Sequence, residues 1–381
     1  SDNKRHFTKY ETDKIEEVKN ILEKLAHPSV NDLRNNIKNG NLLDINITNK
    51  DIDNYVSVYG ENIAFIKGHM NNKRPVKKLN QVTPNEIVSK VSQVIHTDIG
   101  FFNGIMFLVS LVTPINLVIS THLENKTNDS LINALKEQVN IMKIYGYDVM
   151  EIISDDEANF RSIVTIEGVK CNTTSAKEPN AEATIKVLKG RVRSVIASLK
   201  FNLNDILIIE LVKYCTSMIN IMSRSSGTMN SARENMVGHK VSIKELDLCY
   251  GQYVQIYDSK ITSNSVSQQR CFGAIATNPV FNGFKTWFFY NPVTNQIIKS
   301  NNYRKLPMPE EFIEFLNSSC NCENESVNDE KESATKDNNN TQNIISKEPN
   351  VINNTNNSKN IDNIVVTTSS NNNSNTNNSD I

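Results

Sequence analysis

Three acidic residues in this sequence have the types and spacing to hold metal ions. Asp98 ends the run VSQVIHTD, Asp155 ends the apolar run YDVMEIISD, and Glu182 lies at the start of the helical stretch EATIKVLKGRVRSVIASL. Carboxylates on two neighbouring strand ends and on a helix across them would form a cage for two divalent metal ions. Metals held about 4 Å apart clamp the attacking and leaving oxygens of a phosphoryl transfer. The sequence therefore predicts a catalytic, metal-binding site at these three carboxylates.

Each of these acids also has an ordinary structural interpretation. An Asp at a strand end commonly caps a turn, and a Glu beside Lys in a helix commonly pairs with it in solvent. The second ligand has an alternative, because Asp155 is followed directly by Asp156. His96, two residues before Asp98, shares its face of the strand and is either a hydrogen-bonded structural histidine or a contributor to the metal site.

The pattern around the three acids predicts the elements that must position them. Apolar alternation and turn residues indicate a strand ending near Asp98, then two strands joined by a turn at Pro114. The next segment is a helix that ends at Gly146. Further elements follow in the order strand YDVMEIIS, short strand VKCNTT, the Glu182 helix and a long apolar helix over residues 204–222. The main elements that carry Asp98, Asp155 and Glu182 follow a β-β-β-α-β-α pattern, which predicts an α/β fold: an RNase H-like core, with a mixed sheet flanked by helices, of the polynucleotidyl transferase type.

Two groups of basic residues are candidates for nucleic-acid binding. Lys186, Lys189 and Arg193 follow Glu182 at helical spacing and so share one face of its helix. Such a stripe suits a helix lying along a DNA backbone; the alternative is a solvated, salt-bridged face. The second group surrounds Pro75 and is either a phosphate-contacting tether or a solvated linker. Its members are Lys73, Arg74, Lys77 and Lys78.

The flanking segments divide the chain into further regions. Residues 1–80 show helical periodicity and end in the basic linker, and residues 85–225 form the predicted core. Residues 226–319 contain short strand patterns separated by Gly and Asn-Pro turns, which predict a small β-rich module closed by a helix. Residues 320–381 contain 20 Asn among 62 residues, and we expect this tail to be disordered.

Composition narrows the class of protein. The net charge is −1, but the first 319 residues carry 37 basic against 33 acidic side chains, so DNA affinity must come from local basic patches. The longest apolar stretch, residues 105–119, contains Pro114 and Asn116 and is too short to span a membrane. No secretory signal is recognisable, so we expect an intracellular protein. Four cysteines within apolar runs are expected to be buried free thiols: Cys171, Cys215, Cys249 and Cys271. The absence of an initial Met is typical of a fragment or a processed product.

The chain resembles the integrase of copia-type LTR retrotransposons, a relative of the retroviral integrases, over residues 15–316. Asp98, Asp155 and Glu182 fall where that family places its D,D,E metal ligands, and GVKCNTTSAKEPNAEATIKVLKGRVRSVI resembles its segment running into the glutamate helix. AHPSVNDLRNNIKNGNLL and VYGENIAFIKGHMNNKRPVKK resemble the region before the core. GQYVQIYD and RCFGAIATNPVFNGFKTWFFYNPVTNQIIKSNNYRKLPMP resemble the module after it.

The resemblance implies DNA integration: two Mg²⁺ (or Mn²⁺) ions, trimming of the element's 3′ end, and attack of that 3′-OH on target double-stranded DNA. It also implies a homo-oligomer located in the nucleus or in a retrotransposon particle. Integrases usually carry an N-terminal zinc site made of two His and two Cys. Residues 1–90 here contain His6, His27 and His69 but no cysteine, so we expect no zinc. That departure, with a short Asp155–Glu182 segment, motivates an alternative: a decayed or co-opted integrase that binds DNA without catalysis. A third hypothesis is an RNase H-like nuclease without strand transfer.

Overall fold

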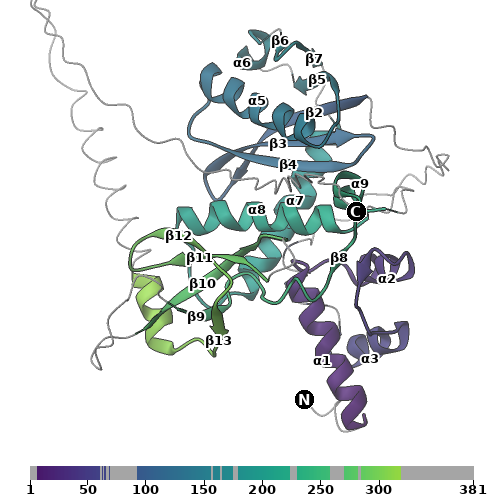
Figure 1. The fold of residues 1–381 in the computed structure, drawn as a ribbon, viewed down its shortest axis with the longest axis vertical. Coiled ribbons are helices and arrows are strands. Elements are labelled where there is room, and N and C mark those ends of the chain that lie inside the picture. Colours follow the sequence, from purple (N-terminus) through teal and green to yellow (C-terminus); the bar gives the residue numbers. More distant parts are fainter. Residues whose placement is uncertain are drawn as a thin grey trace, which may run out of the picture. The chain divides into compact units, whose positions relative to one another are not determined.

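A six-stranded mixed sheet carries the predicted core (Figure 1). The computed structural model describes residues 7–60, 62, 64–65, 68, 92–155, 158–163, 165–174, 179–223, 230–257, 270–281 and 285–318. The strand order is β4-β3-β2-β5-β7-β6, with β2 antiparallel to β3 and parallel to β5. The strands are β2 (Gln93–Phe102), β3 (Ile105–Thr113), β4 (Leu117–Leu123), β5 (Val149–Asp155), β6 (Thr165–Ile166) and β7 (Val169–Thr174). The α/β class and the mixed sheet flanked by helices are confirmed.

The first strand is longer than the sequence pattern indicated. We expected it to end near Asp98, but β2 continues to Phe102 and pairs with β3 along its whole length. The hairpin turns at Asn103 and Gly104, which both have positive φ, as the Asn-Gly turn between twisted strands requires. Asp98 therefore lies in the middle of a strand. Asp155, as predicted, is the last residue of β5.

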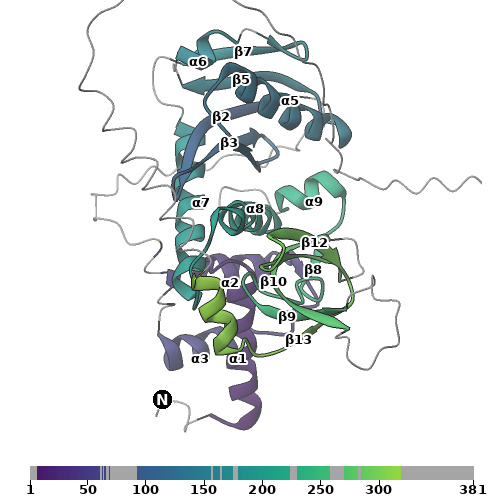
Figure 2. The ribbon, with the colours of Figure 1, turned by 90° about the vertical axis from the view of Figure 1, so that its left-hand side faces the viewer.

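Helices cover both faces of this sheet (Figures 1 and 2). Ile95 and Ile99 of β2 pack with Leu135 and Val139 of α5 on one face. The other face packs against α7 and α8, which contribute Leu188 and Leu211 among others to a second, larger core. The helices are α5 (Asn128–Ile144), α6 (Ala158–Arg161), α7 (Pro179–Ser198), α8 (Asp205–Ile221) and α9 (Ala232–Val237).

The predicted N-terminal helices are α1 (Lys9–Lys24), α2 (Val30–Lys38) and α3 (Asn49–Tyr59). Their starts follow from the sequence, because Thr8, Ser29 and Thr48 each cap the first turn with a side-chain oxygen. The α1 helix buries Ile15, Val18 and Leu22 in the same core as α7 and α8. A two-residue strand, β1 (Leu42–Leu43), pairs in parallel with β8 (Val241–Ser242).

The C-terminal module is a five-stranded antiparallel sheet with order β12-β11-β10-β9-β13. Its strands are β9 (Tyr253–Tyr257), β10 (Cys271–Pro279), β11 (Trp287–Asn291), β12 (Gln296–Ser300) and β13 (Tyr303–Lys305), and a helix begins at residue 310. Trp287 is fully buried in the core. The prediction of four buried thiols was wrong in part. Cys215 is buried, and Cys171 and Cys249 are partly exposed. Cys271 is exposed, because it is the first residue of β10 and lies at the end of its pairing with β9.

One apolar core joins the described parts of the three folded regions. It contains side chains from α1–α3, from α7 and α8, and from β9–β11. The described residues within Ser1–Asp329 accordingly form one compact unit, and Glu330–Ile381 lie outside the described residues. The boundaries at 80, 225 and 319 stay a prediction about the organisation of the sequence. None of the described helices is both long and apolar enough to span a membrane.

Candidate active site

The sheet register brings Asp98 and Asp155 side by side. The parallel pairing of β2 with β5 runs through Ile95–Ile152 and His96–Ile153 to Thr97–Ser154. The next residue on each strand is Asp98 and Asp155, and neighbouring strands lie about 4.8 Å apart. Because β5 ends at Asp155, the part of β2 beyond Asp98 has no β5 residue beside it. Both carboxylates therefore lie where the pairing of these two strands ends. Both side chains are partly exposed.

Both carboxylates belong to the face of the sheet that α7 and α8 cover. Asp98 stands directly opposite Val109 of β3, which is part of the core formed with these two helices. On β5, Ile152 belongs to the opposite, α5-covered core. Since side chains alternate along a strand, Asp155 shares the face of Asp98 rather than that of Ile152.

The α7 helix lies directly on β2 just beyond Asp98. A Cβ atom placed on Gly100 would lie 3.0 Å from the Phe102 ring and 3.5 Å from the side chain of Ile185, so strand and helix approach each other closely there. Two residues further along β2 and four residues further along α7, the Lys189 ammonium lies 6.0 Å from the centre of the Phe102 ring. Four helical residues rise about 6 Å and two strand residues about 6.6 Å, so α7 and β2 run in the same direction.

This alignment places Glu182 toward the Asp98 end of the helix–strand contact. Glu182 lies three residues before Ile185, in the first turn of α7, and its side chain is exposed. Within the described residues, however, no three His, Cys, Asp or Glu side chains lie close enough together to hold a metal ion. The structure brings Asp98 and Asp155 together and sets Glu182 on the helix over the same strand, without closing the three into one ligand group.

Local contacts hold Asp98 and His96 differently. Asp98 Oδ1 accepts a hydrogen bond from the backbone N–H of Ile99 at 2.7 Å. His96 Nε2 lies 3.0 Å from Thr113 Oγ1 at the far end of β3, which supports its structural interpretation. The alternative ligand, Asp156, lies outside the described residues.

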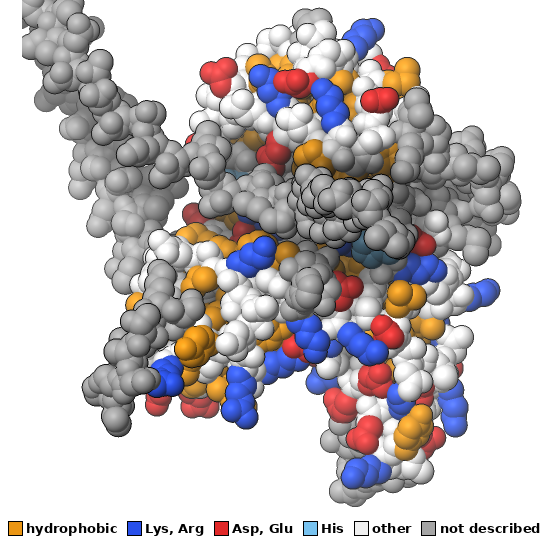
Figure 3. All heavy atoms as spheres, viewed as in Figure 1, with side chains coloured by type: hydrophobic (Ala, Val, Ile, Leu, Met, Phe, Trp, Pro, Cys, Tyr) orange, Lys and Arg blue, Asp and Glu red, His pale blue; other side chains and the backbone are white. Residues whose placement is uncertain are grey.

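The basic stripe on α7 is only partly in open solvent. Lys186 and Arg193 are exposed, while Lys189 is half-buried over the Phe102 ring. On the face that Figure 3 shows, basic and acidic side chains of the described residues are interspersed. The second basic group, Lys73, Arg74, Lys77 and Lys78, lies outside the described residues.

A fourth basic residue of α7 was missed by the sequence analysis. Arg191 is buried and donates hydrogen bonds to the backbone oxygens of Leu25 and Ala26, at 2.9 and 3.2 Å. Burial lowers the pKa of its guanidinium to about 10, partly offset by Asp32. The signal was present in the sequence: position 191 falls between Leu188 and Val192 on the apolar face rather than on the basic stripe.

Comparison of the sequence with models of known protein families and with curated proteins gives no match. Two similar solved structures are viral. The catalytic core domain of BIV integrase is 14% identical over 38% of this chain and 93% of its own, with a TM-score of 0.29. A chain of the simian T-cell lymphotropic virus intasome in complex with PP2A regulatory subunit B56 gamma is 14% identical over 59% of this chain and 84% of its own, with a TM-score of 0.31.

Similarity at this level adds no argument about chemistry, so the class rests on the chain's own topology. Three antiparallel strands, β4-β3-β2, are extended by two parallel strands, β5 and β7, with helices on both faces. This is the arrangement of an RNase H-like α/β core. It is followed by a separate all-β sheet.

Proposed function

We propose that this protein is a polynucleotidyl transferase of the integrase type that acts on double-stranded DNA. The observation that carries the proposal is the register of β2 and β5, which sets Asp98 beside Asp155 at the point where β5 ends. Glu182 completes the proposed set from α7. In this proposal the enzyme trims a 3′ end and joins it to a target strand, as in copia-type retrotransposons.

The donor set fits two Mg²⁺ or Mn²⁺ ions, because both cations prefer carboxylate oxygens. Asp98 and Asp155 would hold them, and Glu182 would join once the first turn of α7 moves toward the pair. Bound ions of this kind supply an activated water and neutralise the charge that develops on the transferred phosphate. Asp98 is fixed in the middle of a paired strand, so it offers a rigid ligand. Lys186 and Arg193 would contact the DNA phosphates beside the site.

The test uses the full chain with a short duplex that mimics a donor end, in Mg²⁺ or Mn²⁺. Wild-type protein should release the terminal nucleotides and join the trimmed end to a second duplex. Asp98→Asn, Asp155→Asn and Glu182→Gln should each lower both activities by at least about 100-fold and bind the duplex as before. Asp129→Asn is the matched control, because Asp129 is exposed at the start of α5, on the opposite face of the sheet. Unchanged activity in Asp98→Asn refutes the assignment.

A second function is favoured by one observation: no three potential ligands gather within the described residues. We propose as the alternative an integrase-like protein that binds DNA without catalysis. Calorimetry with Mn²⁺ separates the two functions. A binding isotherm that Asp98→Asn abolishes supports the enzyme, and the absence of any such isotherm, with DNA binding intact, supports the alternative. Cleavage of RNA–DNA hybrids in preference to duplex ends would support a nuclease without strand transfer.

Oligomeric state and location are also proposals, made from the resemblance alone. An integrase that synapses two DNA ends needs at least two copies, so we propose a homo-oligomer in the nucleus or in a retrotransposon particle. Light scattering of the chain with and without donor duplex tests the first point. A monomer under both conditions contradicts it.

A further inference from the structure

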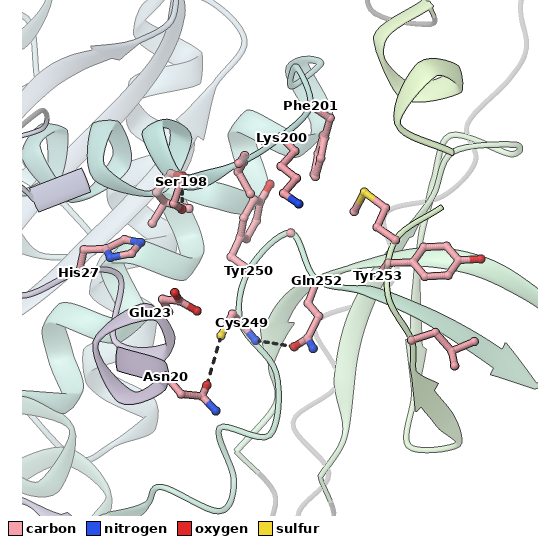
Figure 4. Close-up of a pocket in the computed structure, with 15 residues that line it drawn as sticks. Asn20, Glu23, His27, Ser198, Lys200, Phe201, Cys249, Tyr250, Gln252 and Tyr253 are labelled. Carbon is pink, nitrogen blue, oxygen red and sulfur yellow. Dashed lines mark hydrogen bonds between the residues drawn. The ribbon is translucent and has the colours of Figure 1, made fainter. Parts of the chain in front are cut away.

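A cavity of about 490 Å³ lies at the opposite end of α7 from the candidate active site (Figure 4). Its walls come from the end of α1, the end of α7, the segment before β9, and Leu306 with Met308. Glu182 and Ser198 lie at opposite ends of α7, which separates cavity and carboxylates by about 24 Å of helix. The volume is within the usual range for sites that enclose a small molecule.

Aromatic rings held in fixed positions form much of the lining. Phe201 and Tyr250 are buried, and the Tyr250 hydroxyl donates a hydrogen bond to the backbone oxygen of Leu207. The Tyr253 ring packs at 4.7 Å, edge to face, against Phe312. Rings fixed in this way provide apolar contacts without a further loss of side-chain entropy on binding.

Glu23 supplies an acceptor in this cavity. Its carboxylate is half-buried, and within the described part of the chain no group donates a hydrogen bond to it. Burial raises the pKa of Glu23, with Lys19 acting in the opposite direction. A partly desolvated carboxylate without a donor is costly, and an N–H group from a ligand would relieve that cost.

His27 supplies a donor beside it. The Asn62 side-chain oxygen accepts hydrogen bonds from the backbone N–H groups of Ala64 and Phe65, so its amide nitrogen is the group 3.0 Å from His27 Nδ1. Nδ1 is therefore an acceptor, and the proton of the neutral ring is assigned to Nε2. Figure 4 shows His27 and Glu23 on the same side of the cavity, with Lys200 and Phe201 across it.

We propose that this cavity binds a nucleotide. The base packs against the aromatic lining, one of its N–H groups donates to Glu23, and a neighbouring nitrogen or oxygen accepts from His27 Nε2. The phosphate pairs with Lys200, whose side chain is exposed. A nucleotide combines a flat ring, a donor beside an acceptor on that ring, and an attached anion. It therefore matches the aromatic lining, the Glu23–His27 pair and Lys200 together. The same chemistry could come from a free nucleotide or from an unpaired nucleotide of a nucleic-acid strand.

The experiment measures binding of the four nucleoside monophosphates and of ribose 5-phosphate to the full chain by calorimetry. At least one monophosphate should bind with a dissociation constant below about 1 mM, and ribose 5-phosphate should not. Glu23→Gln should weaken binding about tenfold, because the neutral amide oxygen of Gln accepts a weaker hydrogen bond from the base than a carboxylate does. Asp13→Asn is the matched control: Asp13 is exposed on the same helix, outside the cavity.

Two further arms identify the contacts and the source. Lys200→Gln should weaken the monophosphate but leave the corresponding nucleoside unchanged. Competition by a single-stranded oligonucleotide assigns the site to a strand, and its absence assigns the site to a free nucleotide. Asp98→Asn should bind the nucleotide as wild type does, so the result is independent of the proposed catalysis. The proposal is overturned if none of the monophosphates binds, if ribose 5-phosphate binds equally well, or if folded Glu23→Gln binds unchanged.

Discussion

Replacing Arg191 with Met removes a buried polar link between α7 and the N-terminal helices. The guanidinium donates to the backbone oxygens of Leu25 and Ala26, just past the last turn of α1. Nearby, the Tyr214 hydroxyl of α8 donates to the backbone oxygen of Lys24. The last carbonyls of a helix have no partner within the helix, and a cation there also interacts favourably with the helix dipole. Arg191 thus provides a buried cap for α1.

The expected magnitude follows from two opposing terms. Two hydrogen bonds from a charged donor contribute about 1.5–3 kcal/mol each, and their loss leaves two carbonyls without that donor. Against this, Met relieves the cost of burying a guanidinium that has no described carboxylate within ion-pairing distance, a few kcal/mol. We expect Arg191→Met to lower the free energy of unfolding by about 2–3 kcal/mol.

The assay is equilibrium unfolding in urea, followed by circular dichroism, with limited proteolysis of α1 as a second measurement. Arg193→Met is the control, since it removes the same charge from an exposed position two residues along α7. It should change the free energy of unfolding by less than about 0.5 kcal/mol. Equal stability of Arg191→Met and wild type, or equal effects of the two variants, would refute the capping argument.

Three further predictions follow from named contacts. Gly100→Val should wedge β2 from Ile185, cost about 1–3 kcal/mol of stability and lower end-joining more than DNA binding; Met150→Val, at an exposed site on β5, should do neither. Burial, with Arg191 nearby, lowers the pKa of His27 to about 4, against about 6.5 when unfolded. The stability that His27 contributes is therefore present above pH ~6.5 and lost as pH falls toward ~4, about 3 kcal/mol in all. An unchanged pH dependence of the free energy of unfolding in a His27→Gln variant, measured by urea titration, would contradict this. Removing residues 320–381 should leave the melting temperature and DNA affinity unchanged, and a destabilised core would contradict this. Replacing the four basic residues around Pro75 with Ala should instead reduce the salt slope of DNA binding by up to about four units. An unaltered slope would contradict a role of this segment in phosphate binding. The four replaced residues are Lys73, Arg74, Lys77 and Lys78.

The order of helices and strands could be predicted because it is encoded locally. The strand over Val169–Thr174 was predicted with its observed bounds, and α8 (Asp205–Ile221) to within one residue at each end. The error at Asp98 arose where local signals conflict. Asp98 and Gly100 interrupt the apolar alternation, but pairing with β3 and the Asn103–Gly104 turn carry the strand to Phe102. Pairing between strands is not visible in a single window of sequence.

The candidate site was predictable only as far as its residues lie on strands. Two carboxylates at matching positions of parallel strands become neighbours once the register is known, and Asp98 and Asp155 do. Glu182 depends instead on where α7 crosses the sheet, which the contact between Gly100 and Ile185 determines. The cavity near Glu23 was not predictable, because the wall from α1 lies about 170 to 290 residues before the other walls in the chain.

The position of Glu182 therefore depends on contacts outside the candidate site. Ile185, in the first half of α7, holds the helix against β2. Arg191, in its second half, holds it against the end of α1. A hydrogen-bonded helix moves as a rigid element, so a shift at either contact also shifts its first turn. Metal ligands must be positioned to within about 0.5 Å. Variants that spare all three carboxylates but loosen either contact should therefore lose proposed activity while DNA binding persists.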